Sequence, residues 1–102
     1  MKEIKTHEEL RESTNQSRSV VLFSKEDCIH CTIVKNYIES IEKEYPLIGF
    51  YFTKNRISFD GEKFDTFPVL VFYEKYAEQG RLVGSNHITH LREILNLWFK
   101  KD

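Results

Sequence analysis

The chain has 102 residues, of which 40% are hydrophobic and 14% aromatic, enough for one domain built around one hydrophobic core. Its formal net charge is -1, and its basic residues are scattered among acidic ones, so nothing in the composition indicates binding to nucleic acid or to an anionic membrane. No segment approaches the roughly 18 apolar residues of a membrane span, and the N-terminal segment lacks the apolar core of a signal peptide. We therefore expect residues 1–102 to form a single cytoplasmic domain.

The first part of the chain predicts a helix followed by a buried strand. Thr6 and Glu9 have the spacing of a capping box, which predicts a helix from there through about residue 15. Residues 15–19 are polar and typical of a turn. Residues 20–23, Val-Val-Leu-Phe, form a short apolar run with β-branched side chains, as expected for a strand buried on both faces.

A long amphipathic helix is predicted to begin at the two cysteines, Cys28 and Cys31. Apolar residues recur at helical spacing after Cys31, and Pro46 marks the end of the pattern. Cys28 is therefore expected at the N-terminus of a helix that follows a buried strand. The apolar positions of this helix are Val34, Tyr37, Ile38, Ile41 and Tyr45.

Two further strands are predicted in the middle of the chain. Residues 48–53 are rich in aromatic side chains, which favours a strand. Residues 54–66 are polar and irregular, with room for one short helical turn. Pro68 then opens an apolar strand over residues 69–73, since proline is tolerated at the first residue of a strand.

The last part of the chain predicts a short strand and a terminal helix. A turn around Gln79-Gly80 is expected to lead into a strand over residues 81–83, which ends at Gly84. The order of elements predicts an α/β fold, with a central mixed β-sheet flanked by helices on both faces. The apolar face of the terminal helix is formed by Ile88, Leu91, Leu95 and Trp98, with Ile94 alongside.

The cysteine pair is the strongest functional signal in the sequence. A bridge between Cys28 and Cys31 would close only a very short ring, so structural stabilisation explains the pair poorly. A dithiol exchanger, in contrast, needs one thiolate that attacks a substrate disulfide and a second thiol close by. The free N–H groups and the dipole of a helix N-terminus lower the pKa of a thiol there. We therefore predict Cys28 as the nucleophile and Cys31, shielded one turn further in, as the resolving thiol.

His30 lies between the two cysteines and is the third predicted catalytic residue. Its side chain can donate a hydrogen bond or carry positive charge beside the Cys28 sulfur, which would lower the pKa of Cys28 and make the pair more oxidising. Glu26 and Asp27 act in the opposite direction by like-charge repulsion. Because surface carboxylates are screened by solvent, the helix end and His30 are expected to prevail.

The cysteines also admit two roles outside thiol exchange. One cysteine could simply pack in the core, or the pair could be half of a zinc site, which needs four ligands. His30 cannot easily bind the same ion as both cysteines that flank it, and His87 and His90 begin the distant last helix. The alternative to thiol exchange is thus a non-catalytic or metal-binding module, whereas the main hypothesis implies no metal and no cofactor.

Beyond the cysteines, the sequence resembles the thioredoxin family over nearly its whole length. Residues 66–72, Thr-Phe-Pro-Val-Leu-Val-Phe, are similar to the cis-proline segment of that family. Gly84 and the helix predicted after it are similar to the family's terminal strand, glycine turn and helix. The pair of cysteines, the proline and the glycine occur in the family's order and at workable spacing.

The resemblance implies a protein substrate and a place where it binds. It implies a cis peptide bond at Phe67-Pro68 packed against the cysteines, with the backbone of Phe67 pairing with an extended substrate segment. Gly84 would let the substrate backbone approach closely, and Ile29 would complete the substrate-binding positions. The chain would then be a monomeric thiol–disulfide oxidoreductase acting on protein disulfides or dithiols, with a recycling reductase as its other partner.

The sequence also departs from the thioredoxin pattern around the cysteines. Asp27 replaces the usual Trp, Ile29-His30 replaces Gly-Pro, and Leu22 occupies the position of the buried acid thought to help deprotonate the resolving cysteine. A histidine before the second cysteine is instead similar to bacterial periplasmic disulfide oxidants and protein disulfide isomerases. The chain is too short for the helical insertion of those bacterial oxidants, and the glutathione-binding segment of glutaredoxins is not evident. Leu22 and His30 thus favour an oxidant, a cytoplasmic location favours a reductant, and the direction of electron flow stays open.

Overall fold

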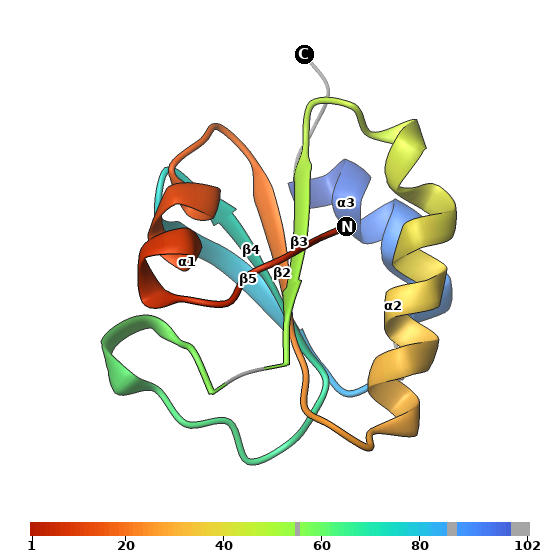
Figure 1. The fold of residues 1–102 in the computed structure, drawn as a ribbon. Helices are drawn as coiled ribbons and strands as arrows, with labels where there is room; N and C mark the ends of the chain where they lie inside the picture. The colour runs from red at the N-terminus through yellow and green to blue at the C-terminus, as the bar shows by residue number, and fades with distance from the viewer. Residues whose placement is uncertain (55, 86–87, 99–102) are drawn as a thin grey trace.

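The computed structural model describes residues 1–54, 56–85 and 88–98, without the side chain of Trp98. The predicted roles of Trp98 and His87 therefore lie outside the described residues. The described chain forms one mixed sheet of five strands in the order β1-β3-β2-β4-β5 (Figure 1). The strands are β1 (Lys2–Glu3), β2 (Ser19–Phe23), β3 (Gly49–Thr53), β4 (Val69–Glu74) and β5 (Ala77–Val83).

The central strand of this sheet is β2, which runs parallel to β3 on one side and antiparallel to β4 on the other. The short strand β1, which the sequence did not predict, extends the sheet beyond β3 in parallel. On the opposite edge β5 pairs antiparallel with β4. The cysteine-bearing helix thus follows the innermost strand of the sheet.

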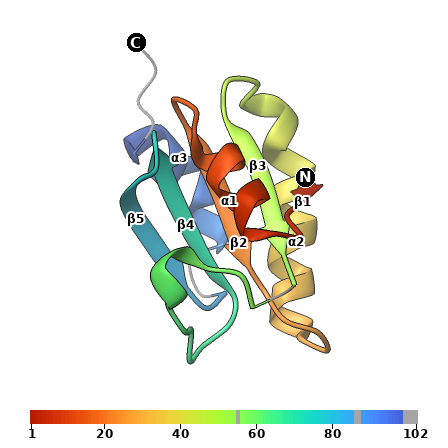
Figure 2. The ribbon, with the colours of Figure 1, turned by 60° about the vertical axis from the view of Figure 1, so that its left-hand side comes forward.

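Three helices cover the two faces of the sheet. Figure 1 shows α1 (His7–Thr14) on one face, and α2 (Ile29–Ile41) and α3 (Leu91–Trp98) together on the other. Figure 2 brings α1 in front of the sheet, with α2 and α3 behind it. The predicted α/β fold with helices on both faces is confirmed. In the described part of the chain, no helix is long and apolar enough to cross a membrane.

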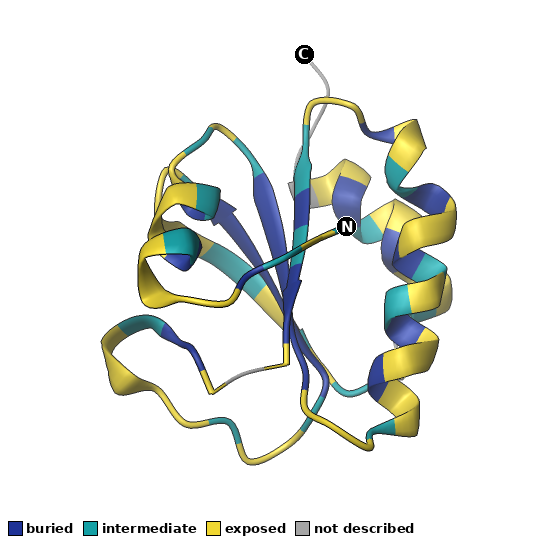
Figure 3. Ribbon diagram, in the orientation of Figure 1, coloured by how far each residue is buried: buried dark blue, intermediate teal, exposed yellow. Residues whose placement is uncertain are grey.

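The two faces of the sheet carry two separate hydrophobic clusters. Along β2 successive side chains alternate between the faces, so Val20 and Leu22 pack beneath α2 and α3, whereas Val21 and Phe23 pack on the α1 side. All five residues of β2 are buried, as the sequence predicted for this strand. Figure 3 shows the buried residues concentrated on the sheet and on the helix surfaces that face it.

The first helix begins as its capping box predicts. The Thr6 hydroxyl oxygen accepts a hydrogen bond from the backbone N–H of Glu9 at 3.0 Å, and the Glu9 carboxylate accepts one from the N–H of Lys5 at 3.0 Å. The first contact satisfies a free N–H group of the helix start, and the second binds the N–H of the residue before the N-cap, one position earlier than in a standard capping box.

The turn before the last strand was predicted at the wrong place. The chain reverses at Lys75 and Tyr76, whose φ angles are 47° and 72°, and not at Gln79-Gly80. The N–H groups of Lys75 and Tyr76 donate to backbone carbonyls of Gln16 and Thr14 at 2.9 and 3.0 Å. These contacts come from a distant segment, so they hold a turn that contains neither Gly nor Asn.

Gly80 lies inside β5, beside an irregularity in the strand pairing. Phe72 pairs with Gly80, but the next residue of β4, Tyr73, pairs with Glu78, so Gln79 is the extra residue of a β-bulge. A lone glycine in a strand often marks such a bulge. The glycine that predicted a turn at this position therefore marks a bulge.

The described residues 56–68, which precede β4, contain one short 3₁₀ turn at Phe59–Gly61. The Phe64 ring packs on Phe23 with ring centroids 4.8 Å apart, and the Arg81 guanidinium lies 5.8 Å from the centroid of Phe64. Arg81 also donates to both carboxylate oxygens of Glu62. These contacts tie the irregular segment to the sheet just before Phe67 and Pro68.

Candidate active site

The loop between β2 and α2 places Cys28 at the end of the sheet. Ser24 donates to the Thr53 carbonyl oxygen through its N–H at 2.9 Å and through its hydroxyl at 2.7 Å, which fastens the end of β2 to the end of β3. Asp27 has a φ of 55°, a left-handed conformation that aspartate tolerates better than most residues. The chain therefore turns sharply just before the cysteines.

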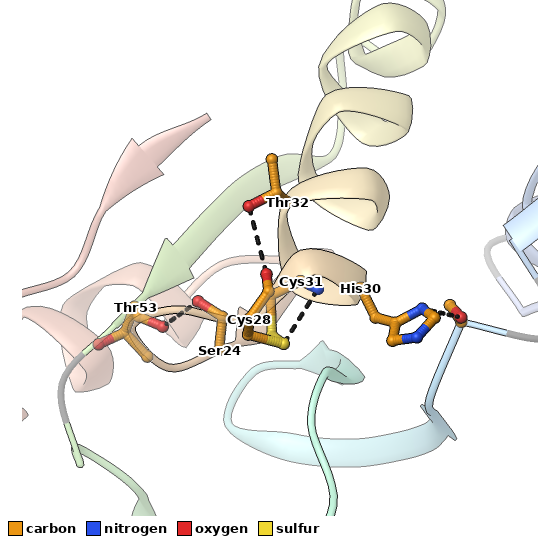
Figure 4. Close-up of a disulfide and its surroundings, with 7 residues drawn as sticks. Ser24, Cys28, His30, Cys31, Thr32 and Thr53 are labelled. Atoms are coloured by element: carbon orange, nitrogen blue, oxygen red, sulfur yellow. Dashed lines mark hydrogen bonds between the residues drawn. A yellow bond between two sulfur atoms is a disulfide. The ribbon is translucent and has the colours of Figure 1, made fainter.

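Cys28 is the N-cap residue of α2. Its backbone is extended, and its Sγ accepts a hydrogen bond from the N–H of Cys31 at 3.2 Å (Figure 4). The Cys28 carbonyl oxygen accepts from the N–H of Thr32 at 3.2 Å and from the Thr32 hydroxyl at 3.3 Å. Sulfur thus occupies the place where an N-cap oxygen usually accepts a free helix N–H. A thiolate at this position would receive the same hydrogen bond and the positive end of the helix dipole.

The two cysteines are joined as a disulfide, with their Cα atoms 5.2 Å apart. They differ in exposure, because Cys28 is half-buried whereas Cys31 is only 4% exposed. The Cys28 sulfur can therefore be reached from solvent, and Cys31 is placed to attack the Cys28 sulfur from the protein side. This difference fits the predicted order of nucleophile and resolving thiol.

His30 lies between the cysteines but turns away from both sulfurs, as Figure 4 shows. Its Nδ1 is 3.1 Å from the hydroxyl oxygen of Ser85, which follows Gly84 in the segment between β5 and α3. Of the two predicted ways in which His30 could act on Cys28, this geometry favours its charge over a direct Nδ1 hydrogen bond to the sulfur. Ser85 was not singled out in the sequence, because a contact across 55 residues leaves no local pattern.

The proline segment and the glycine turn are joined directly. The Phe67-Pro68 peptide bond is cis, the isomer that the resemblance implied. The N–H of Gly84 donates to the Pro68 carbonyl oxygen at 2.7 Å. Gly84 has a φ of +81°, and a Cβ added there would meet no atom within 4 Å, so the positive φ is what requires glycine. The space that such a Cβ would enter beside Gly84 is open.

An open groove of about 490 Å³ runs along the other side of Cys28, between the start of α2 and the end of β3. Phe67, Pro68 and Gly84 do not line it, but Lys25 connects the two regions, because its Nζ lies 5.6 Å from the centroid of the Phe67 ring. Lys35 lies in its wall, with Nζ 4.6 Å from the Phe52 ring centroid and 3.2 Å from a Glu39 oxygen. The groove is lined by Ser24, Lys25, Glu26, Asp27, Cys28, Ile29, Cys31, Thr32, Lys35, Phe52 and Lys54.

Two lysines of this groove were missed in the sequence, although signals for both were present. Lys35 is four residues after Cys31, a spacing that places two side chains on one side of a helix. Lys54 directly follows β3, and the carboxyl ends of neighbouring parallel strands meet at one edge of a sheet. Strand order would have been needed to use the second signal.

Leu22, at the position of the family's buried acid, is completely buried. It belongs to the hydrophobic cluster beneath α2, together with Val34 and Leu70. An apolar side chain in a hydrophobic cluster therefore stands at the position where the family's pattern has a carboxyl group. As for metal binding, the described residues contain no group of three or more His, Cys, Asp or Glu side chains arranged to hold an ion.

No protein-family model matches the sequence, and no curated protein matches it at a significant level. Solved structures do match it. Fasciola hepatica thioredoxin is 24% identical, with a TM-score of 0.77 over 95% of this chain and 98% of that chain. Thioredoxin f2 of Chlamydomonas reinhardtii is 13% identical, with a TM-score of 0.81 over 100% and 99% of the two chains. The chain has the thioredoxin fold.

A third structure supports the same conclusion. Mitochondrial thioredoxin 3 of Saccharomyces cerevisiae is 19% identical, with a TM-score of 0.78 over 94% of this chain and 93% of that chain. The resemblance to thioredoxins predicted from the sequence is thus confirmed for the fold. Within this thioredoxin fold the disulfide lies where β2 leads into α2, and the function has to be argued from that site.

Proposed function

We propose that the chain is a thiol–disulfide oxidoreductase that exchanges protein disulfides through Cys28 and Cys31. The observation that carries this proposal is the placement of the pair: Cys28 caps a helix and is half-buried, and Cys31 is buried one turn behind it. The disulfide between them is the oxidised state of such an enzyme. A structural role explains the pair less well, because the bridge closes a loop with a sequence separation of only 3.

The reaction proceeds in two exchange steps. The Cys28 thiolate attacks one sulfur of the substrate disulfide, a bond forms between them, and the other substrate sulfur leaves as a thiolate. Cys31, after losing its proton to solvent, then attacks the Cys28 sulfur. The Cys28–Cys31 bond forms as the second substrate thiolate leaves. The substrate gains two electrons and the cysteine pair loses two, and the reverse sequence oxidises a substrate dithiol.

The substrate is proposed to be an extended protein segment that docks on the proline side of Cys28. The backbone of Phe67 would pair with it as with an added strand. Open space at Gly84 and the Ile29 side chain, which is 76% exposed, support contacts on either side of the reacting sulfur. A dithiol reductase or a disulfide oxidant would return the pair to its starting state. We propose that the enzyme works as a monomer in the cytoplasm.

The direction of electron flow depends on how strongly the site favours the Cys28 thiolate. His30 and the helix N-terminus favour the thiolate, which destabilises the disulfide and makes the pair more oxidising. Leu22 lies in an apolar cluster, and none of the described residues is a buried Asp or Glu that would accept the proton of Cys31. Both features support a reduction potential on the oxidising side of the range found among proteins with this fold.

Trapping the intermediate tests this function. Cys31→Ser removes the resolving thiol, so reaction with a small protein that carries one accessible disulfide should accumulate a covalent adduct. Mass spectrometry should find the adduct, and an added reductant should release it. Cys28→Ser is the matched control, because it keeps the buried thiol of Cys31 and should form no adduct. Failure of Cys31→Ser to form an adduct, or equal amounts with both variants, would contradict the proposal.

A further inference from the structure

A hydrogen bond joins the first turn of α2 to the segment that follows β5. It links Nδ1 of His30 to the hydroxyl of Ser85 at 3.1 Å. Ser85 is held in place by its neighbour, because Gly84 adopts a φ of +81° and its N–H donates to Pro68 at 2.7 Å. The bond thus connects His30 to the end of the sheet where β5 finishes beside the proline segment.

We propose that Ser85 is a positioning residue, which holds the imidazole of His30 turned away from the Cys28 sulfur. Under this proposal His30 acts on Cys28 through its charge, and Ser85 prevents it from becoming a direct hydrogen-bond donor to the thiolate. The inference rests on the proposed function, since the pKa of Cys28 matters for disulfide exchange. It assigns to Ser85 a part in setting how oxidising the pair is.

A serine hydroxyl suits this role because it both donates and accepts hydrogen bonds. When Nδ1 of His30 carries no proton, the Ser85 hydroxyl donates to it. When the ring is protonated, Nδ1–H donates to the hydroxyl oxygen instead. The contact therefore survives a change in the charge of His30, and the ring keeps its orientation in both states.

The restraint matters because the Cys28 sulfur already accepts one hydrogen bond, from the N–H of Cys31. A second, charged donor would stabilise the thiolate further and lower the pKa of Cys28. The other charged groups described around the sulfur lie on three different elements and do not depend on Ser85. They are Lys25, Glu26 and Asp27 in the loop before Cys28, Lys35 on α2 and Lys54 after β3.

Substitution of Ser85 tests the proposal on the reduced protein. Ser85→Ala frees the ring to approach Cys28, so the pKa of Cys28 should fall and its alkylation below that pKa should become about threefold faster. Ser85→Thr keeps the hydroxyl and should preserve the wild-type pH profile. In a His30→Ala background Ser85→Ala should have no effect. An unchanged or raised Cys28 pKa in Ser85→Ala, or the same shift without His30, would overturn the proposal.

A second measurement observes the contact itself. The ¹⁵N chemical shifts of the His30 ring should change in Ser85→Ala and stay near wild type in Ser85→Thr. Identical ring shifts in all three proteins would overturn the positioning role. Both measurements use only the thiols and the ring, so they remain valid if Cys31→Ser traps no substrate. Failure of the positioning role and failure of the proposed function are therefore distinguishable.

Discussion

At the scale of single residues, Cys28 combines a structural role with a proposed chemical one. It caps α2 with its sulfur, and the same hydrogen bond that closes the helix start would stabilise the thiolate during exchange. Cys31 donates that bond from a buried position and supplies the second thiol. The two roles of each cysteine follow from their spacing of three residues at a helix N-terminus.

Gly84 and Gly61 form a natural pair for testing the substrate-binding side. Both have positive φ angles, +81° and +70°, and neither would bring an added Cβ within 4 Å of another atom. Alanine at either position should therefore lower the free energy of unfolding by a similar amount, about 1 kcal/mol. Only Gly84→Ala should also raise the KM for a protein disulfide, because its Cβ would enter the open space where the substrate backbone is proposed to approach.

Denaturant unfolding and steady-state kinetics check this prediction. Gly61→Ala is the control, since Gly61 lies in the 3₁₀ turn of the segment between β3 and β4. If both variants raise the KM equally, the effect is one of stability and Gly84 has no part in binding substrate.

At the scale of elements, β2 supports the site by burying apolar side chains beneath α2. Leu22→Ala would remove a completely buried side chain from this cluster and leave a cavity. The free energy of unfolding should fall by about 2–5 kcal/mol. The same substitution at Leu47, which is 82% exposed, should change it by less than about 0.5 kcal/mol. Urea unfolding of both variants makes the comparison, and equal losses would contradict this description of the core.

The ion pairs of the β5 strand anchor the segment that ends at Pro68. Arg81 donates to Glu78 and Glu62, and its hydrogen bond is the main cause that lowers the pKa of Glu78 below its usual value. A carboxyl group whose folded pKa is lowered stabilises the fold above its unfolded pKa of 4.5, and this stabilisation is lost as the pH falls through the folded pKa.

Arg81→Met should therefore destabilise the protein at pH 7 and have less effect in acid. The pairs are largely exposed, so the loss at pH 7 should be only about 0.2–1 kcal/mol. It should shrink below about pH 4, where the carboxyl groups of the unfolded chain become protonated. Urea unfolding at pH 7 and pH 3 measures both values. A loss of the same size at both pH values would mean that packing of the Arg81 stem, and not its charge, is responsible.

An element could be predicted from the sequence when the residues that cause it lie close together in the chain. The capping box at Thr6 and the apolar run of β2 carry their signals within a few residues, and both were predicted correctly. The turn at Lys75-Tyr76 was missed because carbonyls of Gln16 and Thr14 hold it from across the fold. Gly80 was misread because the same residue type marks turns and bulges.

At the scale of the whole molecule, the candidate site also contains residues with local sequence signals and residues that only the fold brings together. The cysteines, His30 and Pro68 stand in recognisable motifs, so they could be predicted as site residues from the sequence alone. Ser85 and Lys54 reach the site only through the order of the strands and the path of the chain after β5. Long-range placement of this kind leaves no trace in local spacing.

The whole fold places the cysteine pair beside two different surfaces. On one side lies the groove with its lysines, and on the other lies the proline segment with the open space at Gly84. An extended substrate is expected on the proline side, and Ile29, which also lines the groove, would bring part of that substrate to the groove's rim. The Cys28–Cys31 disulfide is therefore reachable without unfolding any described element.

A redox titration of the purified protein tests the central claim most directly. The protein is equilibrated in dithiol buffers of defined potential, its thiols are trapped, and their number is counted by mass. The account predicts one two-electron transition in which Cys28 and Cys31 become joined, with a midpoint between about -270 and -120 mV. A midpoint above about -200 mV would mark an oxidant or isomerase, and one below about -250 mV a reductant. If no intramolecular disulfide forms anywhere in that range, the exchange function is wrong and the cysteines serve another purpose.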